Sequence, residues 1–144
     1  MALLHNPDTL WQPFGAFSMM AIQGAGQMVH LKGQVSLDAE GEVVGPGDMR
    51  AQVHQVLSNI QTALAAIGGE MGDVVSLVHY ATDIEAFMAA GDIRVGFFQP
   101  PYPITTTVEV AKLFDPRLVI EITASAEVPM ARFQGPATDG MAGA

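Results

Sequence analysis

The sequence of 144 residues contains no cysteine, and it has only 6 lysine and arginine residues against 15 aspartate and glutamate residues. The absence of cysteine excludes catalysis by a thiolate, zinc sites built on cysteine and a disulfide-stapled scaffold. The shortage of basic residues leaves a formal net charge of −9. Such a chain repels a phosphate backbone, which nucleic-acid-binding proteins neutralise with clustered basic side chains. We therefore expect no nucleic acid among the partners of this protein.

Long hydrophobic runs are also missing from the sequence. No segment approaches the ~20 consecutive apolar residues that a membrane-spanning helix needs. The first residues include His5, Asn6, Pro7 and Asp8, where a secretory signal would need a basic start followed by an apolar stretch. Together with the missing cysteines, these absences predict a cytoplasmic protein that has no membrane partner.

The residues that are present suit one folded domain. A chain of this length is typical of a single domain, and a hydrophobic share of 49% with 15% charged residues excludes a disordered chain. We divide the chain into an N-terminal arm over residues 1–15, a domain over residues 16–127 and a flexible tail over residues 128–144, which is rich in glycine, alanine and proline. Trp11 and Phe14 are the expected docking points of the arm.

The first half of the domain shows two strand patterns and one strong helix pattern. Residues 16–22 and 28–37 are expected to pair as a hairpin, because a short glycine-containing connection separates them. Between residues 49 and 67 apolar side chains recur mostly at steps of three and four, which is the stripe of an amphipathic helix. Asp48 can cap the start of this helix, and Gly68-Gly69 ends it.

The second half of the domain alternates strands with a further helix. Residues 74–81 are mostly β-branched and apolar, which predicts a central strand. Thr82 to Glu85 form a capping box that opens a second helix, and this helix must end before Pro100-Pro101. Residues 104–112 and 118–126 alternate between two faces, so we expect two half-buried strands there.

The resulting order β-β-α-β-α-β-β predicts an α+β fold in which two helices cover one face of a mixed sheet. The other face of the sheet is left uncovered. By the alternation of the last strand, this face carries Glu121 together with Thr123 and Ser125. An exposed sheet face with apolar neighbours usually binds a partner subunit, so we expect an oligomer.

A set of short motifs runs in order along most of the chain. They are Phe17-Ser18 after Gly15, Gly33-Gln34, Gln52, Gln55, Leu57, Asn59 and Ile60, Asp73-Val74-Val75, Val108-Glu109-Val110 and Ile120-Glu121-Ile122. This set resembles the RidA/YjgF (Rid) family of small enamine/imine deaminases. The resemblance implies a chorismate-mutase-like fold, a homotrimer, and three clefts at subunit interfaces in which a small-molecule substrate binds. It implies neither a metal nor an organic cofactor.

The chain departs from the family pattern at three positions of the implied site. Thr105 stands where the deaminating members have an arginine that binds the substrate carboxylate through two hydrogen bonds. Phe17 replaces a tyrosine and Lys32 replaces a serine, whereas the glutamate placed to handle the attacking water is retained as Glu121. By this resemblance Glu121 is the catalytic residue, although a carboxylate on such a strand can also be a structural ion-pair partner. The lost arginine predicts poor activity on 2-aminoacrylate-type substrates.

The other candidate residues would bind the substrate. Lys32 and the backbone N–H near Gly33 would hold its anionic or carbonyl end, so that the cation lost at position 105 is supplied from another strand. Thr105 and Phe17 would shape the pocket, and Thr107 offers a hydroxyl hydrogen bond. Simpler alternatives are a solvated strand lysine and threonines that only favour the β conformation.

Two functions stay open for this sequence. The first is hydrolysis or tautomerisation of a small imine or enamine other than 2-aminoacrylate, and the second is a non-catalytic small-molecule-binding protein that keeps the cleft. A role in proteostasis has no specific sequence feature to support it. His54 and His79 lack a second ligand at helical or strand spacing, so we expect no metal site.

Overall fold

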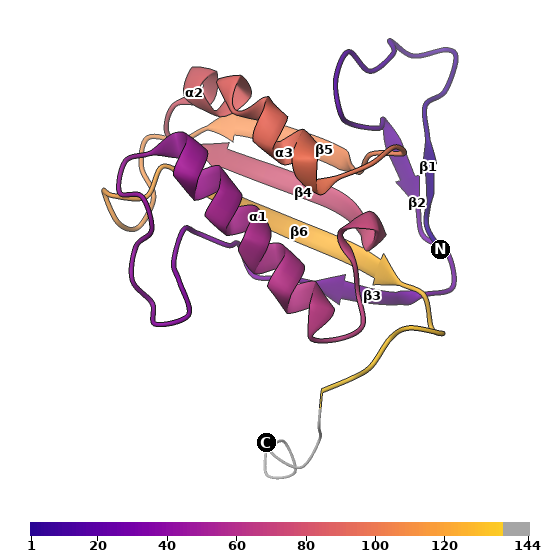
Figure 1. Cartoon of the computed structure of the whole chain (residues 1–144). Coiled ribbons are helices and arrows are strands. Elements are labelled where there is room, and N and C mark those ends of the chain that lie inside the picture. The colour runs from indigo at the N-terminus through magenta and orange to yellow at the C-terminus, as the bar shows by residue number, and fades with distance from the viewer. Residues whose placement is uncertain (137–144) are drawn as a thin grey trace.

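A computed structural model describes residues 1–136 of the chain (Figure 1). The elements are β1 Leu3–His5, β2 Met20–Ile22, β3 Gln27–His30, α1 Met49–Ala65, the 3-10 helix η1 Met71–Asp73, β4 Val74–Ala81, α2 Ile84–Ala89, α3 Gly91–Phe97, β5 Ile104–Glu109 and β6 Ile120–Val128. This order contains the predicted series of strands and helices. It adds one strand at the start, and it divides the second predicted helix into α2 and α3.

Four strands form one mixed sheet in the order β3-β6-β4-β5 (Figure 1). β4 runs parallel to β5 and antiparallel to β6, and β6 runs antiparallel to β3. A parallel pair needs a crossover connection, which α2 and α3 provide between β4 and β5. The predicted α+β architecture, a mixed sheet with helices on one face, is confirmed.

The predicted hairpin between residues 16–22 and 28–37 is wrong. β2 pairs with β1, and β3 pairs with β6 instead. The connection between β2 and β3 is held by Glu127, whose buried carboxylate accepts hydrogen bonds from the backbone N–H groups of Gly24 at 2.8 Å and Gly26 at 2.9 Å. These donors hold the pKa of Glu127 below its ordinary value. Since Glu127 comes from the far end of the domain, the local pattern of residues 16–37 does not reveal this turn.

The long helix α1 forms as its apolar spacing predicts. The carboxylate of Asp48 accepts a hydrogen bond from the backbone N–H of Ala51 at 3.1 Å and so caps the first turn. Gly68, with a φ of +79°, turns the chain away after the helix in a conformation that other residues rarely adopt. The helix lies across the sheet over β6, with its buried side chains toward the strands (Figure 1).

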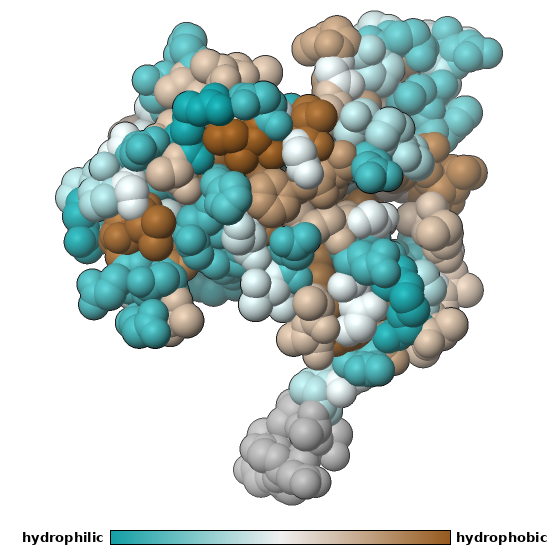
Figure 2. Space-filling view, viewed as in Figure 1, coloured by the Kyte–Doolittle hydropathy of each residue, from teal (hydrophilic) through white to brown (hydrophobic). Residues whose placement is uncertain are grey.

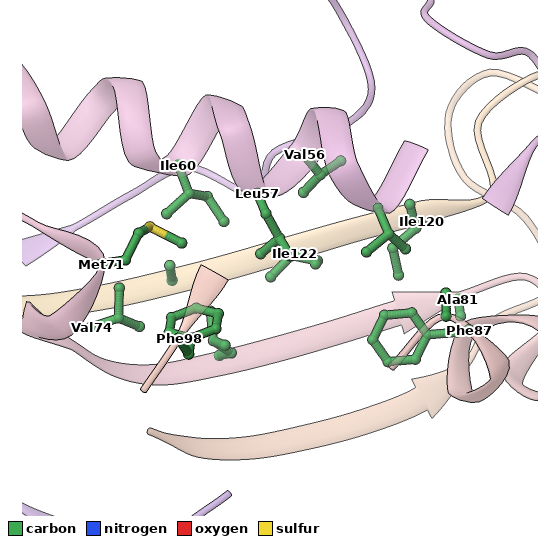
Figure 3. Close-up of a cluster of buried hydrophobic side chains, with 14 of the residues drawn as sticks. Val56, Leu57, Ile60, Met71, Val74, Ala81, Phe87, Phe98, Ile120 and Ile122 are labelled. Carbon is green, nitrogen blue, oxygen red and sulfur yellow. The ribbon is translucent and has the colours of Figure 1, made fainter. Parts of the chain in front are cut away.

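The hydrophobic core lies between this helix and the sheet. Figure 3 shows Leu57 and Ile60 of α1 beside Ile120 and Ile122 of β6, and none of these four side chains is exposed. Side chains alternate between the two faces of a strand, so Glu121, between the two isoleucines, points to the opposite face. The core therefore fixes the direction of the candidate catalytic residue.

The two faces of the sheet differ in how they meet solvent. Over the helix layer, hydrophilic residues are mixed with small hydrophobic patches (Figure 2). Within residues 1–136 no helix covers the other face, on which Val78, Tyr80 and Thr123 are half-buried and Val108 is 39% exposed. Apolar side chains on an uncovered sheet face are typical of a subunit interface. None of the helices in the described part has the length and hydrophobicity needed to cross a membrane.

The beginning of the expected tail is tied to the domain. Arg132 donates hydrogen bonds to both carboxylate oxygens of Asp73, at 2.6 and 3.0 Å, and to the backbone oxygen of Gly68 at 2.9 Å. The backbone N–H of Gln134 binds the oxygen of Ile67. The expected flexible tail starts at residue 128, and its part from residue 137 to residue 144 lies outside the described residues.

Candidate functional site

The candidate site residues fall into two groups on opposite faces of the sheet. Glu121 points to the uncovered face, because the isoleucines on either side of it belong to the core. Thr105 and Thr107 are aligned with Leu77 and His79 of β4, whose side chains are buried beneath the helices. A single chain therefore does not bring Glu121 together with the two threonines.

The first group consists of Glu121 and the segment that follows β3. A Cβ atom built on Gly33 would overlap the Glu121 carboxylate, so this carboxylate lies against the backbone only because residue 33 has no side chain. The neighbouring Gln34 fixes the approach, since its backbone N–H donates to the oxygen of Ile122 at 2.8 Å. Within residues 1–136 the structural ion pair considered for Glu121 is not formed.

Lys32 lies apart from the threonines. It is exposed and lines a groove of about 580 Å³ between residues 32–39 and α1, in which neither Glu121 nor Thr105 takes part. The side-chain amides of Gln55 and Asn59 hold this segment to the helix through the backbone oxygen of Leu37, at 3.3 and 3.0 Å. Within one chain Lys32 does not replace the cation missing at position 105, and its role in substrate binding stays a prediction.

The second group lines a cleft at the β5 edge of the sheet. Phe17, Thr105 and Thr107 border a cavity of about 450 Å³ together with Trp11, Phe14, Gly15, Met88 and Arg94. Ser18 ties the N-terminal segment to this edge, because its backbone N–H donates to the oxygen of Pro103 at 3.0 Å and its hydroxyl donates to the oxygen of Tyr102. Three of the predicted substrate-binding residues thus share one cleft.

Arg94 of α3 is the residue of this cleft that the sequence interpretation missed. Its side chain is half-buried, its Nε atom is buried without a hydrogen-bonding partner, and it forms no ion pair among the described residues. Burial lowers the pKa of its guanidinium, which nevertheless stays protonated. The residues around Arg94 in the sequence do not indicate a role in a binding site, because an arginine on a short helix is usually exposed to solvent. Its membership in a set of only 6 basic residues could have drawn attention to it.

His79 lies in the sheet next to this cleft. Its Nδ1 is 2.9 Å from the hydroxyl of Thr107, and its ring centroid is 4.7 Å from that of Phe87. The side chain is fully buried and its Nε2 has no partner. Burial, and to a lesser degree the positive charge of Arg94, lowers the pKa of His79 to about 3. The imidazole is therefore neutral near pH 7.

We expect His79 to make folding stability depend on pH. The unfolded chain takes up a proton at this residue near pH 6.5, whereas the folded ring resists protonation down to about pH 3. The contribution of His79 is therefore complete above pH 6.5 and is lost as the pH falls toward 3, at up to about 1.4 kcal/mol for each pH unit.

Chemical denaturation at about pH 7.5 and about pH 5 measures this loss. His79→Asn keeps a polar atom near the Thr107 hydroxyl and removes the titration, so its free energy of unfolding should change less between the two pH values. His54→Asn, which changes an exposed histidine of α1, is the control. Equal changes for wild type and His79→Asn would contradict the prediction.

One group of acidic side chains within the described range is close enough to share a metal ion. It consists of Asp83, Glu85 and Glu109, which are all exposed. Two of them already cap α2: Asp83 accepts from the backbone N–H of Ala86 at 3.0 Å, and Glu109 accepts from that of Ile84 at 3.1 Å. Helix capping explains their proximity, and the expectation that the site uses no metal or cofactor stays a prediction.

Comparisons with known proteins identify a family and several relatives that this chain resembles. A sequence model of the family described as endoribonuclease L-PSP matches residues 9–128. A 2-iminobutanoate/2-iminopropanoate deaminase from Dermatophagoides farinae is 33% identical over 102 residues, which cover 71% of this chain and 78% of that protein. A RutC family protein from Pyrococcus horikoshii is 35% identical over 117 residues, or 80% of this chain and 89% of that protein. The solved structure of a Rid-family protein of unknown function from Yersinia pestis superposes with a TM-score of 0.79 at 32% identity, covering 88% of this chain and 98% of the other.

Proposed function

The chain belongs to the endoribonuclease L-PSP family, which includes the Rid and YjgF proteins, and on this premise we propose that it hydrolyses a small imine or enamine. By its name, the related protein from Dermatophagoides farinae acts on 2-iminobutanoate and 2-iminopropanoate, which supports this class of reaction. The observation that carries the proposal is the position of Glu121. Its half-buried carboxylate has no ionic partner in the described part of its own chain and lies against the bare backbone of Gly33.

Glu121 acts as a general base and then as a general acid in the proposed reaction. The water oxygen bonds to the carbon of a protonated imine while Glu121 takes one proton of the water, and the C=N electron pair moves to nitrogen. Glu121 then returns this proton to the nitrogen of the tetrahedral intermediate. The C–N bond breaks as the hydroxyl group loses its proton to solvent and becomes a carbonyl. One water is consumed, and the carbonyl compound, ammonia and a proton are formed.

The site needs a second subunit to be complete. Glu121 and Gly33 lie on the uncovered face of the sheet, and the cleft of Phe17, Thr105 and Thr107 lies at the β5 edge on the helix side. The resemblance to the Rid family implies a homotrimer with interface clefts. In such an assembly the uncovered face of one subunit would meet the cleft of the next and supply its carboxylate.

We expect a homotrimer in solution, because Val78, Tyr80 and Val108 leave apolar surface on a face that no helix covers within residues 1–136. Size exclusion coupled to light scattering should give three times the 15.2 kDa of one chain. Val108→Lys should weaken the assembly, since it places a charge in this interface, whereas Gln61→Lys on the exposed side of α1 should not. A stable monomer of the wild-type chain would contradict both the trimer and the shared cleft.

A non-catalytic binding protein is the alternative, and turnover separates the two. Imines generated in situ by oxidation of amino acids serve as substrates, and ammonia release is measured against the uncatalysed rate. We expect accelerated release, with low activity on 2-aminoacrylate because no arginine stands at position 105. A binding protein would be stabilised against thermal unfolding by the keto-acid product without accelerating the release. We do not propose a ribonuclease, because the net charge of −9 opposes RNA binding. For the location of the protein we propose the cytoplasm.

A further inference from the structure

We propose that Arg94 binds the carboxylate of the substrate while the aromatic cluster of Trp11, Phe14 and Phe17 binds its side chain, so that the preferred substrates are 2-imino acids with a large apolar or aromatic group. The proposal rests on the proposed function and names the substrate class of the same site. In this proposal Arg94 of α3, and not Lys32, supplies the positive charge that binds the substrate.

The charge balance of the cleft is the first argument. Among the described residues of one chain no carboxylate lines it, so Arg94 makes this side of the shared site locally positive on a chain whose net charge is −9. Polar atoms that are buried without a partner are rare in folded proteins, and the Nε of Arg94 is one of them. A guanidinium presents parallel N–H donors that match a carboxylate. Because the Nε is buried, a ligand in the cleft would contact the terminal N–H groups of the guanidinium, and an anionic ligand would balance its charge.

The floor of the cleft adds no charge of its own. Thr107 binds the buried His79, and the ring of His79 has the lowered pKa described above, so it adds no second positive charge beside Arg94. Thr105, which has a short uncharged side chain, also lines the cleft. Arg94 is therefore the positively charged group among the lining residues.

The aromatic cluster is the second argument. The rings of Trp11 and Phe14 are stacked with centroids 5.7 Å apart, and Phe17 meets Phe14 edge to face at 5.2 Å. Phe14 is 82% exposed and Trp11 is 56% exposed, although both line the cleft. Aromatic surfaces of this kind favour apolar ligands, and a volume of about 450 Å³ lies in the usual range for small-molecule sites. The combination selects a carboxylate that carries an apolar or aromatic group.

Trp11 is the only tryptophan of the chain, so its fluorescence reports ligand binding in this cleft. The probes are phenylacetate, the neutral phenylacetamide, and acetate, which has the charge without the ring. We expect wild type to bind phenylacetate at least about ten-fold more tightly than either of the others, since a charge-assisted pair and a buried ring each contribute about this factor.

Arg94→Met keeps the aliphatic stem and removes the charge, so it should abolish the preference for phenylacetate over phenylacetamide. Arg50→Met is the matched control, because Arg50 is an exposed arginine that pairs with Asp92 of α3 at 2.8 Å and does not line the cleft. Arg94→Lys should retain part of the preference, since it keeps the charge without the fork. Circular dichroism and the mass in solution verify that each variant is folded and assembled.

The proposal would be overturned if wild type bound phenylacetamide or acetate as tightly as phenylacetate. It would also be overturned if Arg94→Met kept the preference for phenylacetate while Lys32→Met lost it. A third contrary result is that Arg94→Met weakens the assembly without changing the preference, which would assign Arg94 to a subunit interface. The probes do not react, so their binding is independent of turnover. If the probes behave as expected and no imine is hydrolysed, the proposed function fails and the assignment of Arg94 as an anion-binding residue stands.

Discussion

Glu121→Gln is expected to lower the turnover of an imine substrate by about 10²–10⁴-fold and to leave the binding of phenylacetate within about two-fold of wild type. Glutamine keeps the size and shape of the side chain but cannot accept the proton of the attacking water. The contact with Gly33 leaves little space around this carboxylate, so an isosteric change is needed to keep the local packing. The large loss expected for turnover reflects the removal of the general base.

Ammonia release under saturating substrate measures this effect, and Trp11 fluorescence measures probe binding in the same preparation. Glu85→Gln is the control, because Glu85 is an exposed carboxylate in the first turn of α2. It removes the same negative charge without touching the sheet face. If Glu121→Gln kept turnover within about three-fold of wild type, general-base catalysis by this residue would be ruled out. If turnover and probe binding fell together, Glu121 would contribute to the shape of the cleft rather than to proton transfer.

Gln52→Leu is expected to lower the free energy of unfolding by about 2–6 kcal/mol. The side chain of Gln52 is fully buried, and its Nε2 donates to the backbone oxygens of Gly45 at 2.8 Å and Arg117 at 2.7 Å. Its Oε1 accepts from the backbone N–H of Val119 at 2.9 Å. Leucine fits the space but removes all three bonds. The backbone N–H of Val119 is left without a partner, which costs about 1–3 kcal/mol when buried. The oxygens of Gly45 and Arg117 still accept from the backbone N–H groups of Asp48 and Gly47, so each of these two lost bonds costs about 0.5–1.5 kcal/mol. Because α1 would lose its links to two loops at once, the effect is large against a typical total of about 5–15 kcal/mol.

Denaturant unfolding at one fixed protein concentration measures this loss, since assembly contributes to stability by mass action. Gln61→Leu makes the same substitution at an exposed position of the same helix and should change the free energy of unfolding by no more than about 0.5 kcal/mol. A loss below about 1 kcal/mol for Gln52→Leu would mean that water or a shifted side chain replaces the three bonds.

Local periodicity along the chain was enough to predict several parts of this protein. The apolar stripe and Asp48 predicted α1, and the β-branched run predicted β4 with its observed bounds. The alternation around Glu121 placed that carboxylate on the uncovered face, because side chains on a strand change face at every residue. The ordered motifs indicated the family. These features need only neighbours that are close in the chain.

Which segments pair and which side chains meet became known only from the folded chain. The pattern of residues 16–37 predicted a hairpin, but Glu127 holds the turn from a distant strand and each of the two strands pairs elsewhere. Lys32 and Arg94 have the same sign of charge. Only the crossover between β4 and β5 carries Arg94 to the cleft of Thr105, and the end of β3 leaves Lys32 beside α1. Strand order and crossover geometry arise from contacts between residues far apart in the chain, which the spacing of residues within one segment does not encode.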